Sequence, residues 1–537
     1  MKEFVAGPKG QKLINLGFFA ISLLPVMLFC FIMAQRIALP FDLEWGEGAG
    51  INQINRLLSG DPIYAAPSLE YVALVYTPFY YLLSAVISRV VMPVALAARL
   101  LSVLATLGTV GIIFWLVTRE TKNFLAAWLA GALYLACFGL SDGFFDLVRV
   151  DSLYVFLLMS SLMLIRTTST TLGRVMTGLM ISVGVLTKQS TIIVFLPLMA
   201  YLVIRSWRLS WPLLMSTVMG IGLSFLWINS LSGGWFAYYI LRLPVEHGYS
   251  LISAVDFWVG DFLGPLGIAV GFGIFYFISN FKTSEDHKAG GDGEKGERDG
   301  KETWIWNLPH HVVIYGFFLA GAIAAAWMTR ATNGGGANNV MSAYAATALV
   351  FGLGLDEAEQ LVSNAKRSWR LLEIFLPCLV AVQIAGLIYN PFGYIPTKLE
   401  IEANQELVAE MSGVEGPVFI PYRSQLPALA GKPALIHAVN LFELTGYFHG
   451  DMLPEGMELI ETIRKGICHQ SFGMIVLDQP VPWFREQIAS AYQINDKLSL
   501  PDDTKRSDQL HWQGGFESVY YPLDFYSLEN CLSTISK

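Results

Sequence analysis

Charged residues are scarce in this sequence of 537 residues, of which Asp, Glu, Lys and Arg make up only 15%. An average soluble domain carries about 25%. The shortage excludes an ordinary soluble protein, and no basic stretch interleaved with aromatic residues suggests a nucleic-acid partner. The net charge of −8 says little about partners, because most charged residues lie in loops, in one linker and in the C-terminal part.

Cysteine is also rare, and the five cysteines show no spacing typical of a metal site. Cys30, Cys137 and Cys378 lie in apolar runs, where a free cysteine packs as a small hydrophobic residue. Cys468 and Cys531 lie in the C-terminal part. These two could pair if that part faces an oxidising compartment.

What the sequence does have is long apolar runs, with 54% hydrophobic residues overall. Many runs approach the ~20 residues that cross a bilayer. We therefore expect a mainly α-helical, polytopic membrane protein of about eleven spans, the first of them too long for a cleavable signal. The expected spans are 13–35, 98–117, 124–141, 152–166, 174–187, 190–205, 211–231, 257–280, 309–328, 337–355 and 370–390.

Basic residues indicate an orientation, because cytoplasmic loops carry an excess of Lys and Arg. With a cytoplasmic N-terminus, the basic groups that flank the spans all fall on the cytoplasmic side: Lys9, Lys12, Arg119, Lys122, Arg166, Arg174, Arg205, Arg208, Lys366, Arg367 and Arg370. This agreement requires that the apolar segment 76–91 is not a span. We therefore expect residues 37–97 to form one external loop with amphipathic helices, in a multi-pass protein of the plasma membrane.

Two segments depart from the membrane pattern. Residues 281–303 mix both charge signs with glycine, which predicts a disordered cytoplasmic linker. After Asn390 the composition becomes that of a soluble domain with short apolar strands. We therefore predict a membrane domain over 1–390 and a small extracytoplasmic α/β domain over 391–537, without a nucleotide-binding fingerprint.

The most unusual stretch follows the first span, where Asp42, Glu44 and Glu47 lie within six residues. Ionisable groups at a membrane boundary are functional candidates by default, although a solvated acidic loop is the plainer interpretation. In the predicted topology the same external face also collects Asp142, Asp146, Arg149, Asp151, Lys188, Arg242, Glu246, His247 and Arg330.

Such a set can perform acid–base chemistry on an anionic lipid substrate. Carboxylates can deprotonate a hydroxyl, and Lys188 can bind a lipid phosphate as a point charge, or merely extend along the membrane surface. Arg149 and Asp151 could instead simply pair with each other. Arg330 precedes three glycines at 334–336, whose amides can cradle an anion, although a plain turn fits equally well.

The order of several motifs carries a family resemblance. They are Glu47-Gly48, Arg56-Leu57-Leu58-x-Gly60, Asp61-Pro62-Ile63-Tyr64, Tyr76-Thr77-Pro78-Phe79-Tyr80-Tyr81, Ala97-Ala98-Arg99-Leu100, Arg149-x-Asp151, Leu186-Thr187-Lys188 and the asparagine-containing glycine loop at 334–339. In this order they resemble the glycosyltransferase C (GT-C) superfamily, specifically family 39. That family contains protein O-mannosyltransferases and lipid A aminoarabinose transferases, and the resemblance covers nearly all of the membrane part.

The resemblance implies transfer of a sugar from a polyprenyl-phosphate donor to a lipid, glycan or protein hydroxyl outside the membrane. It implies a catalytic carboxylate in the first external loop. Gly46-Glu47 stands at the family's Asp-Glu pair, which leaves the base open between Glu47 and Glu44. Lys188 matches a phosphate-binding lysine and Asp151 a second acidic position, whereas the family's first-loop Lys-Pro-Pro-Leu is replaced by Tyr76-Thr77-Pro78-Phe79.

We therefore expect an inverting displacement with three groups of site residues. The catalytic group is Glu47, Glu44 and Asp151, the phosphate-binding group is Lys188, Arg330 and Arg149, and Tyr76 and Asp146 line the substrate groove. No cofactor is certain, although the carboxylates could hold a divalent cation. The alternatives are a transporter or flippase for lipid-linked sugars, and an inactive GT-C relative that serves as a binding subunit.

Overall fold

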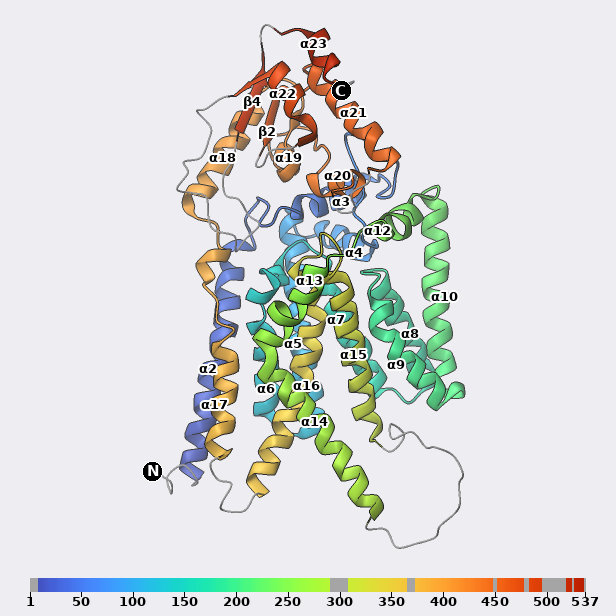
Figure 1. The fold of residues 1–537 in the computed structure, drawn as a ribbon, viewed down its shortest axis with the longest axis vertical. Helices are drawn as coiled ribbons and strands as arrows, with labels where there is room; N and C mark the ends of the chain where they lie inside the picture. Colours follow the sequence, from blue (N-terminus) through green and yellow to red (C-terminus); the bar gives the residue numbers. More distant parts are fainter. Residues whose placement is uncertain are drawn as a thin grey trace.

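The computed structural model describes residues 8–289, 308–364, 372–447, 452–477, 482–494, 518–523 and 526–535. The molecule is elongated, with a long helical bundle and a smaller α/β part stacked on one end (Figure 1). The N-terminus lies at the opposite end of the bundle, far from the C-terminus.

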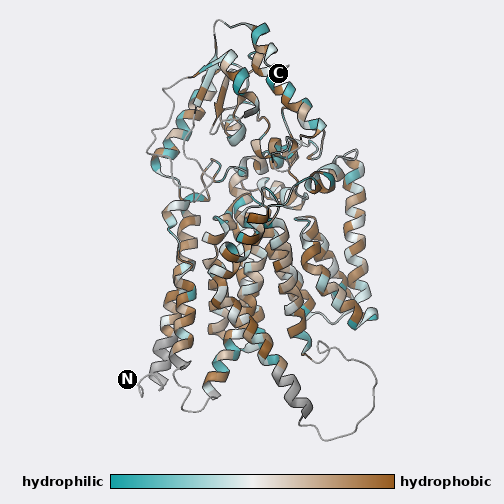
Figure 2. Cartoon of the chain, in the orientation of Figure 1, coloured by the Kyte–Doolittle hydropathy of each residue, from teal (hydrophilic) through white to brown (hydrophobic). Residues whose placement is uncertain are grey.

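The bundle is built from apolar helices, which appear brown and white along most of their length in Figure 2. They are α2 (Pro8–Arg36), α5 (Val94–Thr121), α6 (Phe124–Ala136), α7 (Asp151–Thr167), α8 (Thr171–Val185), α9 (Thr191–Arg205), α10 (Trp207–Leu231), α14 (Gly264–Ala289), α15 (His310–Arg330), α16 (Met341–Asn364) and α17 (Leu372–Ala385). Within the described residues, six stretches are long and apolar enough to cross a membrane: Leu16–Arg36, Val94–Thr121, Phe124–Ser141, Trp207–Leu231, Leu251–Phe281 and His310–Arg330. The predicted mainly helical, multi-pass membrane architecture is confirmed, while the number of eleven spans stays a prediction.

Small residues let the bundle helices approach closely. A Cβ on Gly178 of α8 would lie 2.5 Å from the backbone oxygen of Leu213 in α10. A Cβ on Gly321 of α15 would lie 2.0 Å from the backbone oxygen of Val194 in α9. Because lipid supplies no hydrophobic force between helices, such close backbone contact is a main source of packing energy.

The end of the bundle beneath the α/β part carries two short helices, α3 (Glu47–Ser59) and α4 (Phe79–Ser88). α3 ends where Gly60 adopts a left-handed conformation, with φ of 85°. The 10 residues of α4 span about 15 Å, against about 30 Å of hydrocarbon, so α4 is too short to cross alone.

Shorter elements complete this end. They are η1 (Gly139–Ser141), η2 (Phe144–Asp146), α11 (Trp235–Ala237), η3 (Tyr238–Arg242), α12 (Leu243–Val245), α13 (Leu251–Asp256), η4 (Phe257–Leu263), η6 (Ala337–Val340) and η8 (Pro391–Tyr394). At the other end, α14 extends to Ala289, into the segment predicted as a linker from residue 281. The rest of that predicted linker, from residue 290, lies outside the described residues.

The α/β part holds a four-stranded sheet of order β1-β2-β4-β3. β1 (Val418–Phe419) runs parallel to β2 (Met474–Leu477), and β4 (Ser518–Pro522) is antiparallel to both β2 and β3 (Tyr492–Ile494). The helices and turns around the sheet are α18 (Lys398–Gly413), η9 (Pro421–Arg423), α19 (Leu426–Leu429), α20 (Ala438–Leu444), α21 (Pro454–Cys468), η10 (Pro482–Phe484), α22 (Arg485–Ala491) and α23 (Leu528–Ser533). A parallel pair needs a crossover, and here helices α19 to α21 supply it.

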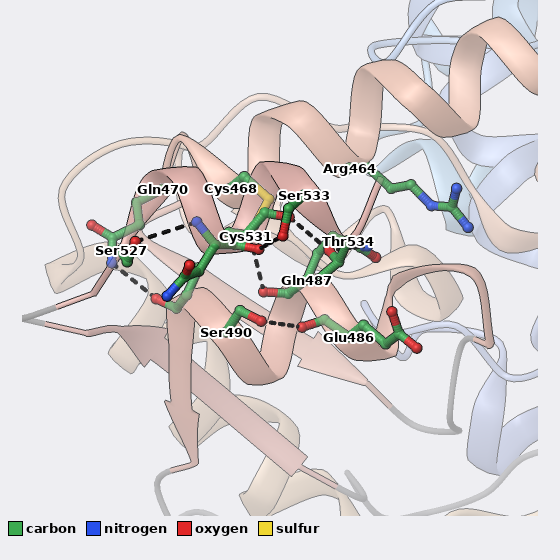
Figure 3. Close-up of a disulfide and its surroundings, with 12 residues drawn as sticks. Arg464, Cys468, Gln470, Glu486, Gln487, Ser490, Ser527, Cys531, Ser533 and Thr534 are labelled. Carbon is green, nitrogen blue, oxygen red and sulfur yellow. Dashed lines mark hydrogen bonds between the residues drawn. A yellow bond between two sulfur atoms is a disulfide. The ribbon is translucent and has the colours of Figure 1, made fainter. Parts of the chain in front are cut away.

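A disulfide joins Cys468, at the end of α21, to Cys531 in α23 (Figure 3). Beside it, Gln487 Nε2 of α22 donates to Thr534 Oγ1 at 2.7 Å. These contacts fasten the C-terminal helix onto the rest of the α/β part.

Hydrogen bonds also fasten the α/β part onto the membrane end. Asn440 Nδ2 of α20 donates to the backbone oxygen of Val72 at 2.6 Å. Asn52 Nδ2 of α3 donates to Ser424 Oγ at 2.7 Å. Such contacts along the segment 37–97 place α20 and η9 directly against it.

Candidate functional site

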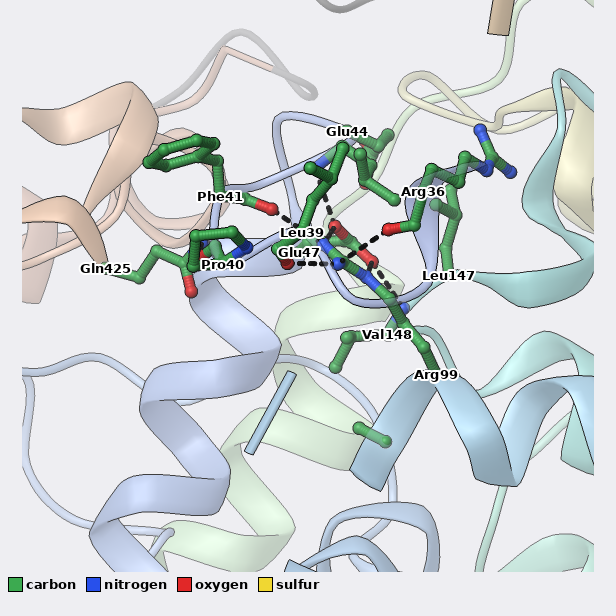
Figure 4. Close-up of polar contacts among 12 residues, drawn as sticks. Arg36, Leu39, Pro40, Phe41, Glu44, Glu47, Arg99, Leu147, Val148 and Gln425 are labelled. Atoms are coloured by element: carbon green, nitrogen blue, oxygen red, sulfur yellow. Dashed lines mark hydrogen bonds and ion pairs between the residues drawn. The ribbon is translucent and has the colours of Figure 1, made fainter. Parts of the chain in front are cut away.

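The segment between α2 and α3 is held by the guanidinium group of Arg99 from α5 (Figure 4). Arg99 donates to both oxygens of Glu47, with Nε–Oε1 at 3.1 Å and Nη2–Oε2 at 2.7 Å. It also donates to the backbone oxygens of Leu39 at 2.6 Å and Phe41 at 2.7 Å. One buried arginine therefore fixes both the loop and the first residue of α3.

The carboxylate of Glu47 is fully engaged. The backbone N–H groups of Leu43 and Val148 donate to it, each at 2.7 Å, and the side chain has no exposed surface. Burial alone would raise the pKa of Glu47, but the charge and hydrogen bonds of Arg99 outweigh burial and hold that pKa below its ordinary value. Glu47 therefore stays ionised and anchors the start of α3.

A second buried ion pair joins α2 to the loop before α7. Arg36 Nε lies 2.9 Å from Asp146 Oδ2, and each side chain is 1% exposed. Arg36 also donates to the backbone oxygens of Gly143 at 2.6 Å and Tyr394 at 3.2 Å. Asp146 is therefore enclosed by protein, and its expected place in a substrate groove has no support in this geometry.

The pair formed by Glu44 and Arg149 is less tightly held. Arg149 Nε lies 3.3 Å from Glu44 Oε2, and the arginine side chain is 14% exposed. The guanidinium group lies against Gly46, where a Cβ would be only 2.5 Å from Nη1 of Arg149. The missing side chain at position 46 is what lets Arg149 reach Glu44.

Asp151 begins α7, and Lys188 lies in the turn between α8 and α9. Lys188 Nζ is 2.6 Å from Asp151 Oδ1 and 2.8 Å from Asn339 Oδ1 of η6. The same Nζ lies 6.0 Å from the ring centre of Tyr76 and 5.5 Å from that of Tyr154. The ammonium group is thus enclosed by polar and aromatic partners, unlike a lysine that extends along the membrane surface.

Tyr76 lies near both ion pairs, with Lys188 Nζ 6.0 Å from its ring centre. Burial raises the pKa of its hydroxyl, the charge of Arg149 lowers it, and the carboxylates of Asp151, Glu443 and Glu44 raise it. Influence from both pairs requires that the hydroxyl lies near both of them. Glu44, Tyr76, Arg149, Asp151 and Lys188 therefore form one group, here called the charge cluster.

Helix α20 of the α/β part lies close to the charge cluster. His437 caps the N-terminus of α20, and its ring centre lies 6.4 Å from that of Trp45. Burial and the charge of Arg149 lower the pKa of His437 to about 3, so this imidazole is neutral. On the same helix, Glu443 Oε2 lies 2.5 Å from His247 Nε2.

Asp42 is a further buried carboxyl group, 3% exposed, beside α3. A Cβ on Gly48 would lie 2.9 Å from its Oδ2. Burial, together with the negative charge of Glu47, raises the pKa of Asp42 well above its ordinary value. Asp42 therefore retains a proton at a higher pH than an exposed aspartate does.

Arg330 stands apart from the charge cluster. Its Nε lies 2.7 Å from Asp261 Oδ2 in η4, and its Nη1 donates to the backbone oxygen of Gly335 at 2.8 Å. A Cβ on Gly335 would lie 2.4 Å from the backbone oxygen of Thr329. The glycine loop is thus folded back on the end of α15, which favours the plain-turn interpretation over an anion cradle.

Two residues that are central in the structure received no role in the sequence analysis. Arg99 is the only charged residue in residues 94–118 of the apolar helix α5, and a lone arginine in such a run is itself a signal of an internal partner. Asn339 lies in the glycine-rich loop, but nothing in the sequence pairs it with Lys188. Their partners come from distant helices, so spacing alone could not reveal them.

Among the described residues, no three His, Cys, Asp or Glu side chains lie close enough together to hold a metal ion. The acidic loop shows why: Glu47 is bound to Arg99 and Glu44 faces Arg149. The divalent cation that the sequence left open therefore has no preformed site in that part of the chain.

Solved structures resemble this chain over nearly its whole length. ArnT from Cupriavidus metallidurans in the apo state is 14% identical with a TM-score of 0.56, covering 94% of this chain and 97% of ArnT. The same protein bound to undecaprenyl phosphate gives 13% identity and a TM-score of 0.54, covering 97% and 99%. AglB from Archaeoglobus fulgidus, in complex with an inhibitory peptide and a dolichol-phosphate, gives 10% and 0.48, covering 88% and 70%. No family model and no curated protein matches the sequence.

Proposed function

We propose that this chain, which has the GT-C fold, is a membrane glycosyltransferase that takes a sugar from a polyprenyl-phosphate donor. It passes the sugar to a hydroxyl of a lipid, glycan or protein acceptor. The observation that carries the proposal is the charge cluster, in which two cations and two carboxylates meet beneath α20 at one end of a membrane bundle. The relative that binds undecaprenyl phosphate shares this fold and supports a donor of that class.

Lys188 and Arg149 are the proposed ligands of the donor phosphate. Lys188 supplies a compact charge that is already oriented by Asp151 and Asn339. Arg149 supplies a planar guanidinium group whose pair with Glu44 is long, at 3.3 Å, and partly exposed. Preoriented cations stabilise the charge that develops on the leaving phosphate. Arg330, bound to Asp261, has no part in this proposal.

Glu44 is the proposed base, in preference to Glu47 and Asp151. Glu47 accepts four hydrogen bonds from Arg99, Leu43 and Val148, so its oxygens face inward. Asp151 holds Lys188 at 2.6 Å, which suits a positioning residue. The ion pair of Glu44 with Arg149, at 3.3 Å, is longer than the pair of Asp151 with Lys188, at 2.6 Å, and its arginine is partly exposed.

The proposed reaction is a single in-line displacement. The acceptor oxygen attacks the anomeric carbon, the bond from that carbon to the phosphate oxygen breaks, and the polyprenyl phosphate leaves with the electron pair. Glu44 takes the acceptor proton, which contributes typically 10²–10⁴-fold to the rate. Lys188 and Arg149 neutralise the phosphate, and Tyr76, which lies near both of them, is the proposed contact of the sugar.

We propose the same orientation that the basic residues predict, with a cytoplasmic N-terminus and the α/β part outside the plasma membrane. The disulfide Cys468–Cys531 supports this placement, because disulfides persist in oxidising compartments. Figure 1 supports it too, since the N-terminus and the α/β part lie at opposite ends of the bundle.

The deciding experiment offers purified protein in lipid a panel of polyprenyl-phosphate sugars and follows donor breakdown by mass spectrometry. Wild type is compared with Glu44→Gln, Lys188→Met and the control Lys122→Met, a lysine outside the charge cluster. We expect one donor to be consumed, with a loss of about 10²-fold or more in the first two variants and none in the control. Binding of a lipid-linked sugar without any breakdown would instead favour the transporter or the inactive relative.

A further inference from the structure

A separate cavity lies at the opposite end of the bundle from the charge cluster. It lies between the ends of α7 and α9 and the starts of α8, α10 and α15, and its volume is about 160 Å³. That volume corresponds to about five water molecules, which is room for a phosphate group. Nothing in the proposed sugar transfer uses this cavity.

The lining of the cavity is basic and rich in hydroxyl groups. Arg174, Arg205 and His310 contribute to it, together with Ser206 and Ser210. Among the described residues that line it, none is acidic. The guanidinium group of Arg174 forms no ion pair within the described part of the chain, so its charge remains available to a ligand.

The ion pair between Glu120 and Arg166 at this end of the bundle lies outside the cavity lining. Glu120, which lies at this end, is engaged by Arg166 at 2.7 Å and by the hydroxyl of Tyr315 at 2.8 Å. His310 Nδ1 lies 2.8 Å from the hydroxyl of Tyr201. The described lining of the cavity therefore holds two guanidinium groups, several hydroxyl groups and no carboxylate, a donor set that matches a phosphate.

The cavity also adjoins the lipid-facing surface. Leu209 lines it and is 53% exposed, while Ile204 of α9 is 71% exposed. Trp207 and Trp211 pack against each other with ring centres 4.8 Å apart, both partly exposed at the start of α10. Tryptophan gathers at the level of lipid headgroups, so these rings indicate that the cavity lies at headgroup depth.

We propose that this cavity binds the phosphate headgroup of an anionic phospholipid from the leaflet at the N-terminal end of the bundle. Arg174 and Arg205 hold the phosphate, and the acyl chains lie against the exposed apolar side chains beside Leu209. The bound lipid bridges α8 and α9 to α15. This site is independent of the sugar transfer and does not rest on it.

The test uses the full-length protein in nanodiscs that contain phosphatidylglycerol and phosphatidylcholine, with bound lipid measured by native mass spectrometry. The variants are Arg174→Gln and Arg205→Gln, with Arg208→Gln as a matched control. Arg208 is an exposed arginine at the start of α10, close to Arg205 in the sequence, and it does not line the cavity. We expect wild type and the control to retain phosphatidylglycerol selectively, and the affinity to fall about tenfold or more in the two cavity variants, a loss of at least ~1.4 kcal/mol.

Further measurements separate loss of binding from misfolding and a lipid site from a site for free phosphate. Arg174→Lys retains the charge and should recover most of the binding, and a thermal unfolding scan of each variant excludes loss through misfolding. Soluble glycerol phosphate in excess should leave the lipid in place. If Arg208→Gln lost as much lipid affinity as the cavity variants, the attraction between basic residues and anionic lipid would be diffuse. If glycerol phosphate displaced the lipid, the cavity would be a site for free phosphate. Either result overturns the proposal.

Discussion

At the scale of single residues, the acidic stretch after α2 contains two carboxylates with different roles, Glu44 and Glu47. Glu47 is closed off by Arg99 and two backbone N–H groups. Glu44 forms a longer pair with the partly exposed Arg149. Their sequence neighbourhoods are alike, so the difference arises from the helices packed around them.

Replacing Glu47 should damage the fold more than the chemistry. Glu47→Gln removes the charge that compensates the buried Arg99, and loss of one partner of a buried pair typically costs about 3–5 kcal/mol. We expect a clear fall in the midpoint of thermal unfolding, measured by tryptophan fluorescence, while Glu44→Gln unfolds near the wild-type temperature. An unchanged midpoint together with a 10²-fold loss of turnover would instead make Glu47 the base.

Gly46 should tolerate no side chain. In Gly46→Ala the new Cβ would displace the guanidinium group of Arg149. Because small displacements of catalytic groups can cost 10²-fold, we expect a loss of about that size in donor turnover. The matched control is Gly111→Ala in α5, where a Cβ would have no neighbour within 4 Å and activity should be kept. Equal activity in both variants would show that Arg149 has no part in the reaction.

At the scale of elements, α20 is the piece of the α/β part that closes over the site. It contributes His437 beside Trp45, Asn440 to the backbone of Val72, and Glu443 to His247. The contact of Glu443 with His247 ties α20 to the loop after α12. That contact should make the docking of α20 depend on pH.

Burial lowers the pKa of His247, but the hydrogen bond and charge of Glu443 outweigh burial and hold the pKa above its ordinary value of about 6.5. A raised pKa means that the stabilisation is fully present below about pH 6.5 and is lost as pH rises through the higher folded value. We expect the unfolding midpoint to fall over that window in wild type, and to lose this dependence in His247→Gln. If the unfolding midpoint depended on pH equally in both proteins, the proposed effect of the contact between His247 and Glu443 would be contradicted.

At the scale of the whole molecule, the chain stacks a small α/β part on a membrane bundle with the charge cluster at their junction. Two of the four hydrophobic clusters among the described residues reflect this division, one around α6, α15 and α16 and another that joins the α/β part to residues 63–75. The disulfide lies within the second core. Loss of the disulfide should therefore destabilise the α/β part and leave the bundle intact.

Cys468→Ser, Cys531→Ser and the double variant should each weaken the α/β part by about 2–5 kcal/mol, the usual effect of removing a native disulfide. Limited proteolysis should release fragments of the α/β part sooner, while the bundle stays intact. Cys378→Ser, which changes a free cysteine, is the control. Unaltered proteolysis in the double variant would mean that Cys468 and Cys531 are not paired in the membrane-bound protein.

Several features were predictable from the sequence because they depend on local pattern. Long apolar runs predicted the helical membrane bundle, and the order of motifs predicted the GT-C fold; both are confirmed. Gly60 ends α3 in a left-handed conformation, which glycine commonly adopts just after a helix. These signals need no knowledge of which helices become neighbours.

The tertiary structure alone decided how the charged residues are paired. Asp146 was expected to line a groove, and in the structure it is paired with Arg36 of α2. Arg330 was expected to bind a phosphate, and in the structure it is paired with Asp261. Glu47 is bound by an arginine 52 positions later in the chain, and Lys188 by Asn339, 151 positions away. In a low-dielectric interior a charge takes the nearest opposite partner that packing provides, so the sequence determined which charges are present and the helix packing decided which remain for chemistry.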